Sequence, residues 1–134
     1  MAEQIQMRLI GYTVDKMSFI LNKSFHIEPH HKIQVKPSFN REITKKDDNR
    51  FILTLSISFD DYQEALPFYL DIQISGVFEV KNWEFEPAHT IARVNATAIL
   101  FPYLRSLVTT LTANANVPPY VLPITNPDKL FKNK

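Results

Sequence analysis

Residues 99–131, with the sequence ILFPYLRSLVTTLTANANVPPYVLPITNPDKLF, join an apolar helical run to a proline-rich apolar end. From about residue 88 to residue 113, apolar side chains recur every three or four positions, which predicts one long helix. Pro102 lies inside this run, and a proline removes a backbone donor and clashes with the preceding turn. We therefore expect Pro102 to kink the helix or to split it into two. The Asn-Pro-Asp start at residues 126–128 predicts a short final helix.

Upstream of residue 83 the apolar pattern has a period of two, which is typical of strands with one buried face. Pro37 lies in one of these segments and favours an edge strand or a bulge, because it cannot donate to a ladder. Gly11 and Gly76 each predict a bend or bulge in a long strand. Since strands come first and helices last, the sequence predicts an α+β domain. The alternating segments are residues 5–21, 33–43, 51–59 and 66–80.

The predicted helix presents two adjoining apolar stripes, whereas one sheet covers only one of them. Several large apolar side chains left in water would favour self-association. We therefore predict that one stripe is an oligomer interface. The alternative is a helix whose two stripes are both buried within one subunit. The predicted interface residues are Leu100, Leu104, Leu107 and Leu111.

A second surplus of apolar residues lies beside prolines, in and just after a crossover loop expected at residues 22–32, and in residues 117–131. Prolines interrupt regular packing there, so these segments form grooves readily. Extended polypeptides bind in such grooves by burying alternate side chains. The alternative is that these residues close one end of the core. The predicted client-binding residues are Phe25, Ile33, Val35, Pro37, Tyr120, Leu122 and Phe131.

The composition excludes several classes of protein. The formal net charge of this 134-residue chain is +1, and its basic residues are scattered, so the charged patch expected of a nucleic-acid-binding protein is missing. No cysteine is present, which excludes disulfides and thiol nucleophiles. The N-terminus lacks a signal-peptide pattern, and no segment reaches the roughly 20 apolar residues that span a bilayer. We therefore expect a cytoplasmic protein without membrane insertion.

Catalytic and cofactor motifs are also missing from the sequence. Two glycines cannot supply a glycine-rich phosphate loop, and the serines on the strands have no nucleophile-elbow pattern. The histidines invite a metal interpretation, but they lie mainly in a proline-broken loop, where a solvated surface is the commoner environment. We predict a protein that is not an enzyme and needs no cofactor or metal. The histidines are His26, His30, His31 and His89.

The order of these features resembles the SecB family of protein-export chaperones. The resemblance implies one domain over residues 1–134, a four-stranded antiparallel sheet backed by helices, and assembly as a dimer of dimers. It also implies ATP-independent holding of unfolded polypeptides, with clients bound near Val35, Pro37, Tyr120, Leu122 and Phe131. The residues that carry the resemblance are Leu100, Phe101, Pro102, Tyr103 and Arg105, the segment Ser75 to Phe78, and Val117, Pro118, Leu122, Pro123, Asn126, Asp128, Leu130 and Phe131.

Members of that family offer acidic residues on the sheet to the export motor SecA. Asp71 falls on one such position and is the predicted motor contact, whereas Lys16 and Ile20 stand where acidic residues are expected. Coupling to SecA is therefore left open. Two alternatives also stay open: a dedicated chaperone for the antitoxin of a toxin–antitoxin pair, and a non-chaperone oligomeric module that binds a small apolar ligand.

Overall fold

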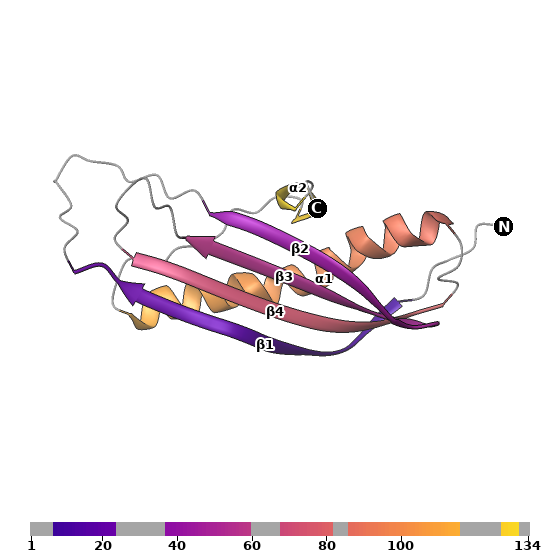
Figure 1. Cartoon of the computed structure of the whole chain (residues 1–134), viewed down its shortest axis with the longest axis horizontal. Coiled ribbons are helices and arrows are strands. Elements are labelled where there is room, and N and C mark those ends of the chain that lie inside the picture. Colours follow the sequence, from indigo (N-terminus) through magenta and orange to yellow (C-terminus); the bar gives the residue numbers. More distant parts are fainter. Residues whose placement is uncertain (1–6, 24–36, 60–67, 82–85, 116–126, 132–134) are drawn as a thin grey trace.

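The computed structural model describes residues 7–23, 37–59, 68–81, 86–115 and 127–131. Four strands are followed by a long helix and a short one, which confirms the predicted α+β order (Figure 1). The strands form one antiparallel sheet in the order β1-β4-β3-β2. The elements are β1 (Met7–Leu21), β2 (Ser38–Asp47), β3 (Arg50–Phe59), β4 (Phe68–Val80), α1 (Glu86–Asn114) and α2 (Pro127–Leu130).

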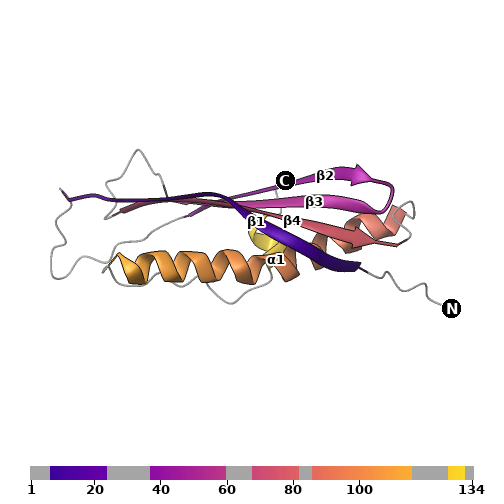
Figure 2. The same ribbon diagram turned by 90° about the horizontal axis from the view of Figure 1, so that it is seen from below.

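The core lies between one face of the sheet and α1 (Figure 2). Along β3 and β4 every second side chain is buried, as the period-two pattern predicts. The inner face of the sheet therefore consists of large apolar side chains. They are Phe51, Leu53, Leu55, Ile57 and Phe59 of β3 and Phe68, Leu70, Ile72, Ile74, Phe78 and Val80 of β4.

Helix α1 is continuous through Pro102, and its axis bends near the middle (Figure 2). The prediction of a kink is confirmed, and the alternative of two separate helices is wrong. Pro102 lies on the exposed side of the helix, where its ring needs no space in the core.

The predicted oligomer stripe is part of the core instead. Leu100 and Leu104 are 0% exposed beneath the sheet of their own chain, so the prediction that they contact another subunit is wrong. Leu107 and Leu111 are half-buried and also pack against the core. The sheet covers Leu100 and Leu104, and the ring of Phe131 packs against Phe101, so much of the apolar surface of α1 is covered within the chain.

Gly76 has a packing role that differs from the predicted bend. The register of β4 with β3 runs without a shift through Gly76, and the irregularities fall on β1, between Leu9 and Gly11 and between Val14 and Lys16. The bulge expected at Gly11 is therefore confirmed, whereas β4 pairs with β3 without a bulge at Gly76. A Cβ atom at Gly76 would lie 3.1 Å from a side-chain carbon of Leu9 and 3.2 Å from one of Leu100. The glycine thus makes room for α1.

Pro37 precedes β2, which is an edge strand within the described residues, as its proline predicts. The expected crossover loop at residues 22–32 lies almost wholly outside the described residues. The turn between β2 and β3 is described. In it the backbone N–H of Asn49 donates to the Asp47 carboxylate at 3.0 Å.

Replacing Gly76 with valine should lower the free energy of unfolding by about 1–3 kcal/mol, because the new methyl groups overpack the contact with Leu100. Gly11→Val is the matched control: a Cβ at Gly11 meets nothing within 4 Å, and the expected change is below about 0.5 kcal/mol. Urea denaturation of both variants measures the difference. Equal stability of the two variants would contradict this account of Gly76.

Candidate functional site

The inner face of β1 is apolar but largely uncovered. The register places Tyr12, Val14, Met17 and Leu21 opposite the buried residues of β4, so their side chains point to the same face as the core. Their exposed fractions nevertheless lie between 41% and 54%. Helix α1 causes this exposure, because it packs mainly against β3 and β4 and much less against β1.

The neighbouring side of α1 extends this exposed surface. Ile99 is 38% exposed and Tyr103 is 40% exposed, and the ring centroid of Tyr103 lies 4.5 Å from that of Tyr12. We call the set Tyr12, Val14, Met17, Leu21, Ile99 and Tyr103 the apolar face. Contiguous apolar surfaces that are open to solvent mark interaction sites.

The apolar face also lies beside a sheet edge. Within the described residues, β1 pairs only with β4, so its other edge has no strand partner among them. Edge strands that carry exposed apolar side chains favour association with another chain. Surface and edge together make this the strongest candidate interaction site among the described residues.

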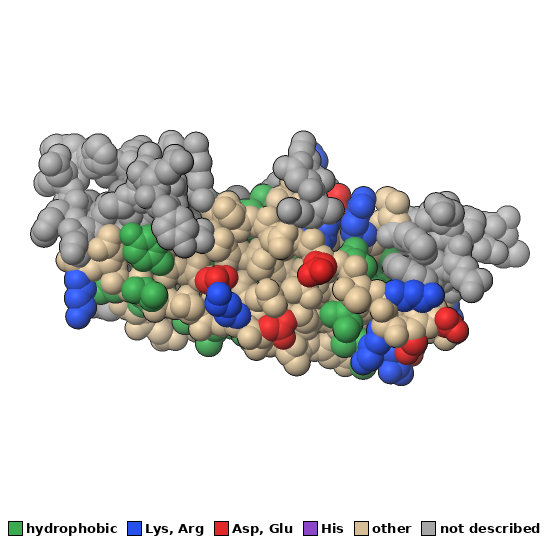
Figure 3. Space-filling model, viewed as in Figure 1, with side chains coloured by type: hydrophobic (Ala, Val, Ile, Leu, Met, Phe, Trp, Pro, Cys, Tyr) green, Lys and Arg blue, Asp and Glu red, His purple; other side chains and the backbone are tan. Residues whose placement is uncertain are grey.

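The outer face of the sheet is polar, with charges of both signs among small hydrophobic groups (Figure 3). Asp71, the predicted motor contact, lies on this face and is half-buried. The ammonium group of Lys16 donates to its carboxylate at 2.6 Å. The structure therefore places a cation directly on the one acidic residue that matched the expected motor site.

Hydroxyl groups cross the middle of the outer face in a row. Thr54 and Ser75 are hydrogen-bonded at 2.9 Å, and the hydroxyls of Ser75 and Thr13 both donate to the carboxylate of Asp15. Burial raises the pKa of Asp15, but hydrogen bonds from Ser75, Thr13 and Gln73 together lower that pKa below its ordinary value. Asp15 is consequently ionised at neutral pH and organises the row.

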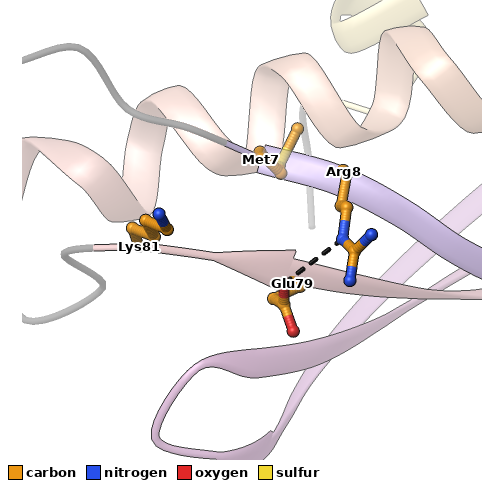
Figure 4. Close-up of a pocket in the computed structure, with 4 residues that line it drawn as sticks. All are labelled: Met7, Arg8, Glu79 and Lys81. Atoms are coloured by element: carbon orange, nitrogen blue, oxygen red, sulfur yellow. Dashed lines mark hydrogen bonds and ion pairs between the residues drawn. The ribbon is translucent and has the colours of Figure 1, made fainter.

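At one end of the sheet a hollow of about 310 Å³ is lined by residues of both signs (Figure 4). Arg8 on β1 and Glu79 on β4 form an ion pair at 3.2 Å, next to Met7 and Lys81. Glu79 also lies 3.8 Å from the guanidinium group of Arg50. One carboxylate thus faces two arginines.

A buried arginine fixes the C-terminal helix against the sheet. Arg41 on β2 has a side chain that is only 2% exposed, and it donates to Asp128 of α2 at 2.6 Å. It also donates to the Thr97 hydroxyl of α1 at 3.2 Å and to the Phe131 carbonyl at 3.1 Å. Its guanidinium carbon lies 5.9 Å from the ring centroid of Phe131. One side chain therefore joins three elements.

The predicted client-binding residues have different outcomes. Phe25, Ile33, Val35, Tyr120 and Leu122 lie outside the described residues. Pro37 is half-buried just before β2.

Phe131 was predicted to bind clients, but it is 1% exposed, between the rings of Phe39 and Phe101. In this structure it belongs to the core, and its prediction as a surface contact is wrong.

Sequence reasoning missed Arg41 and the apolar face. Arg41 could have been identified from the sequence, because it occupies an inward-facing position between Phe39 and Ile43 in the alternating pattern. A charge in such a row indicates a buried ion pair. The apolar face carries no comparable signal, since the pattern of β1 does not tell which part of the sheet the helix covers.

The described residues hold no group of three or more histidine, cysteine, aspartate or glutamate side chains placed to bind a metal. The side chains of the four histidines are not described. Within the described part of the chain, the helices are too short or too polar to cross a bilayer.

Comparison with known proteins gives a consistent result over the whole chain. The family model for the preprotein translocase subunit SecB matches residues 1–134. An uncharacterized protein of Methanocaldococcus jannaschii is 34% identical over 131 residues, which cover 95% of this chain and 83% of that protein. The protein-export protein SecB of Ruegeria pomeroyi is 26% identical over 124 residues, which cover 87% of this chain and 73% of that protein.

A solved structure has the same fold. A SecB-like chaperone of Mycobacterium tuberculosis, in complex with a ChAD peptide from the HigA1 antitoxin, superposes with a TM-score of 0.70 and 14% identity. The match covers 89% of this chain and 90% of that one.

Arg41→Met should lower the free energy of unfolding by about 2–4 kcal/mol, because it removes the buried cation that holds Asp128 and the Phe131 carbonyl. Hydrogen exchange should increase most at residues 127–131. Lys45→Met, an exposed change on the same strand, is the matched control and should cost less than about 0.5 kcal/mol. Similar losses in both variants would contradict the role assigned to Arg41.

Proposed function

Because the chain belongs to the SecB family, we propose that it is a cytoplasmic chaperone that holds unfolded polypeptides without ATP. The match over residues 1–134 is the observation that carries this proposal. The fold and the relatives named protein-export protein SecB support a chaperone role. The polar and apolar surfaces of the described residues suit binding rather than catalysis.

We propose that the apolar face joins subunits into a homo-oligomer, a dimer of dimers. Tyr12 and Tyr103 already contact each other across β1 and α1, so they form one continuous surface. A second copy of this surface would bury it and would also give the open edge of β1 a partner. This assignment replaces the leucine stripe, whose central residues are committed to the core.

If the apolar face is buried between subunits, clients must bind to another apolar surface that stays exposed in the oligomer. We propose that this surface runs along the segment that ends at Pro37 and along the segment that leads to α2. Phe25, Ile33, Val35, Tyr120 and Leu122 remain its proposed contacts. The Arg41 network supports the idea by fixing α2 beside β2, which sets the position of the second segment.

A dedicated antitoxin chaperone is the second candidate. The observation that favours it over delivery to SecA is the ion pair between Lys16 and Asp71 at 2.6 Å. A carboxylate that is already neutralised offers little attraction to a basic partner. The M. tuberculosis chaperone of the same fold was solved with an antitoxin peptide.

The protein should suppress the light scattering of an aggregating, chemically unfolded protein at stoichiometric amounts, with no effect of added ATP. Accessible apolar surface gives this activity, so suppression should extend to several unrelated clients. Suppression of one antitoxin alone would favour the dedicated chaperone. The absence of suppression, together with tight binding of a lipid-like molecule, would instead favour the module that binds a small apolar ligand.

Tyr103→Asp should convert the oligomer to a smaller species in sedimentation velocity, because it places a charge in the centre of the apolar face. The variant should stay folded, since Tyr103 is 40% exposed. Ser106→Asp, an exposed position on the same helix, is the control and should leave the oligomer unchanged. A folded Tyr103→Asp variant with the sedimentation of the parent protein would exclude this interface.

A further inference from the structure

A groove of about 470 Å³ crosses the outer face of the sheet near the β2–β3 turn. Most of its lining residues lie on the face of the sheet opposite α1, and Tyr12, which also belongs to the apolar face, is among them. Hydrophobic side chains lie beside lysine and arginine toward this end of the outer face (Figure 3).

The floor of the groove is apolar. Val77 of β4 and Ile52 of β3 are paired neighbours that point outward, and Ile10 of β1 adds a side chain that is 45% exposed. Gly11 pairs with Val77 and would also point outward, but it has no side chain to fill the space. A Cβ atom placed there meets nothing within 4 Å. The floor therefore consists of neighbouring residues on β1, β4 and β3. The distance from the β1 axis to the β3 axis is roughly 10 Å.

One end of the groove is cationic. Lys46 and Arg50 line the groove at the turn, and the described residues that line it include no carboxylate. The nearby carboxylates have other contacts: Asp47 accepts from Asn49, Asp15 accepts from the lining hydroxyls of Thr13 and Ser75, and Glu79 lies between Arg8 and Arg50. The charged side chains among the described lining residues are therefore both cations.

We infer that this groove binds an extended, acidic segment of a polypeptide, with apolar side chains on the floor and carboxylates beside Lys46 and Arg50. The apolar floor suits the apolar side chains of such a segment, and the cationic end suits its carboxylates. A small ligand suits the site less, because such ligands are usually enclosed over most of their surface, whereas this groove lies open on a sheet. The inference rests on the proposed chaperone function and adds a class of client to it.

The test uses the full-length protein and a fluorescein-labelled peptide that has two leucines at alternate positions followed by two glutamates. Fluorescence anisotropy should show saturable binding that weakens as salt is raised. Peptides with glutamine or lysine in place of glutamate should bind at least about fivefold more weakly.

Two variants locate the site. Lys46→Glu should weaken binding about fivefold or more, whereas Lys45→Glu, the same charge change on the adjacent residue outside the groove lining, should not. Gly11→Val should also weaken binding, because its side chain fills the groove without meeting other atoms at its Cβ. These three results together support the inference.

Other outcomes overturn it. Equal binding of the three peptides would show that the carboxylates are not recognised. Equal losses of peptide affinity in the Lys46 and Lys45 variants would show that the peptide does not bind in this groove. If no peptide binds, or decanoate alone binds, while aggregation is still suppressed, the groove inference fails and the proposed function stands. Loss of both peptide binding and suppression in the parent protein would overturn both.

Discussion

One helix covers a sheet that is wider than the helix. With side chains an α-helix is about 10 Å across, whereas four strands side by side occupy roughly 19 Å. Helix α1 approaches the sheet closely at Gly76, where a Cβ atom would lie only 3.2 Å from a side-chain carbon of Leu100, and it packs mainly on β3 and β4. Part of the inner side of β1, at Tyr12, Val14, Met17 and Leu21, is left without cover. The apolar face is thus a direct result of the difference in width.

The two faces of the sheet consequently have different chemistry. The inner face is mainly apolar, with Arg41 as a buried charge on β2, and its uncovered strip on β1 favours another apolar surface. The outer face carries hydroxyls, paired charges and a groove with a cationic end. A chaperone built from this domain would offer different partners two unlike surfaces, separated by a single layer of backbone.

The sequence predicted the elements well, because periodicity reports which residues share a face. The strands, the helix with its proline and the edge position of β2 were all predicted from spacing and proline alone. Periodicity does not report what covers a face, and the errors follow from this. Leu100 and Phe131 were predicted to lie at surfaces, but the sheet covers the first and neighbouring aromatic rings cover the second. Gly76 was interpreted through its backbone, although its role is to leave space for a distant helix.

The site was less predictable than the fold. The apolar face depends on the position of α1 across the sheet, which is a property of packing and not of any one segment. Of the predicted client-binding residues, Pro37 and Phe131 alone fall among the described residues, so that set largely remains a prediction. Arg41 was visible in the sequence as a charge in an inward row, but its partners lie 56, 87 and 90 residues away. No local pattern identifies such partners.

The distance along the chain between Arg41 and its partners has a consequence for biosynthesis. A ribosome adds Arg41 long before it adds Asp128 and Phe131, so the guanidinium group in the nascent chain must stay hydrated until almost the entire domain has emerged. Burial of this cation before then would leave it without its carboxylate, which is strongly unfavourable. The contact of β2 with α2 therefore forms only after translation has passed α2.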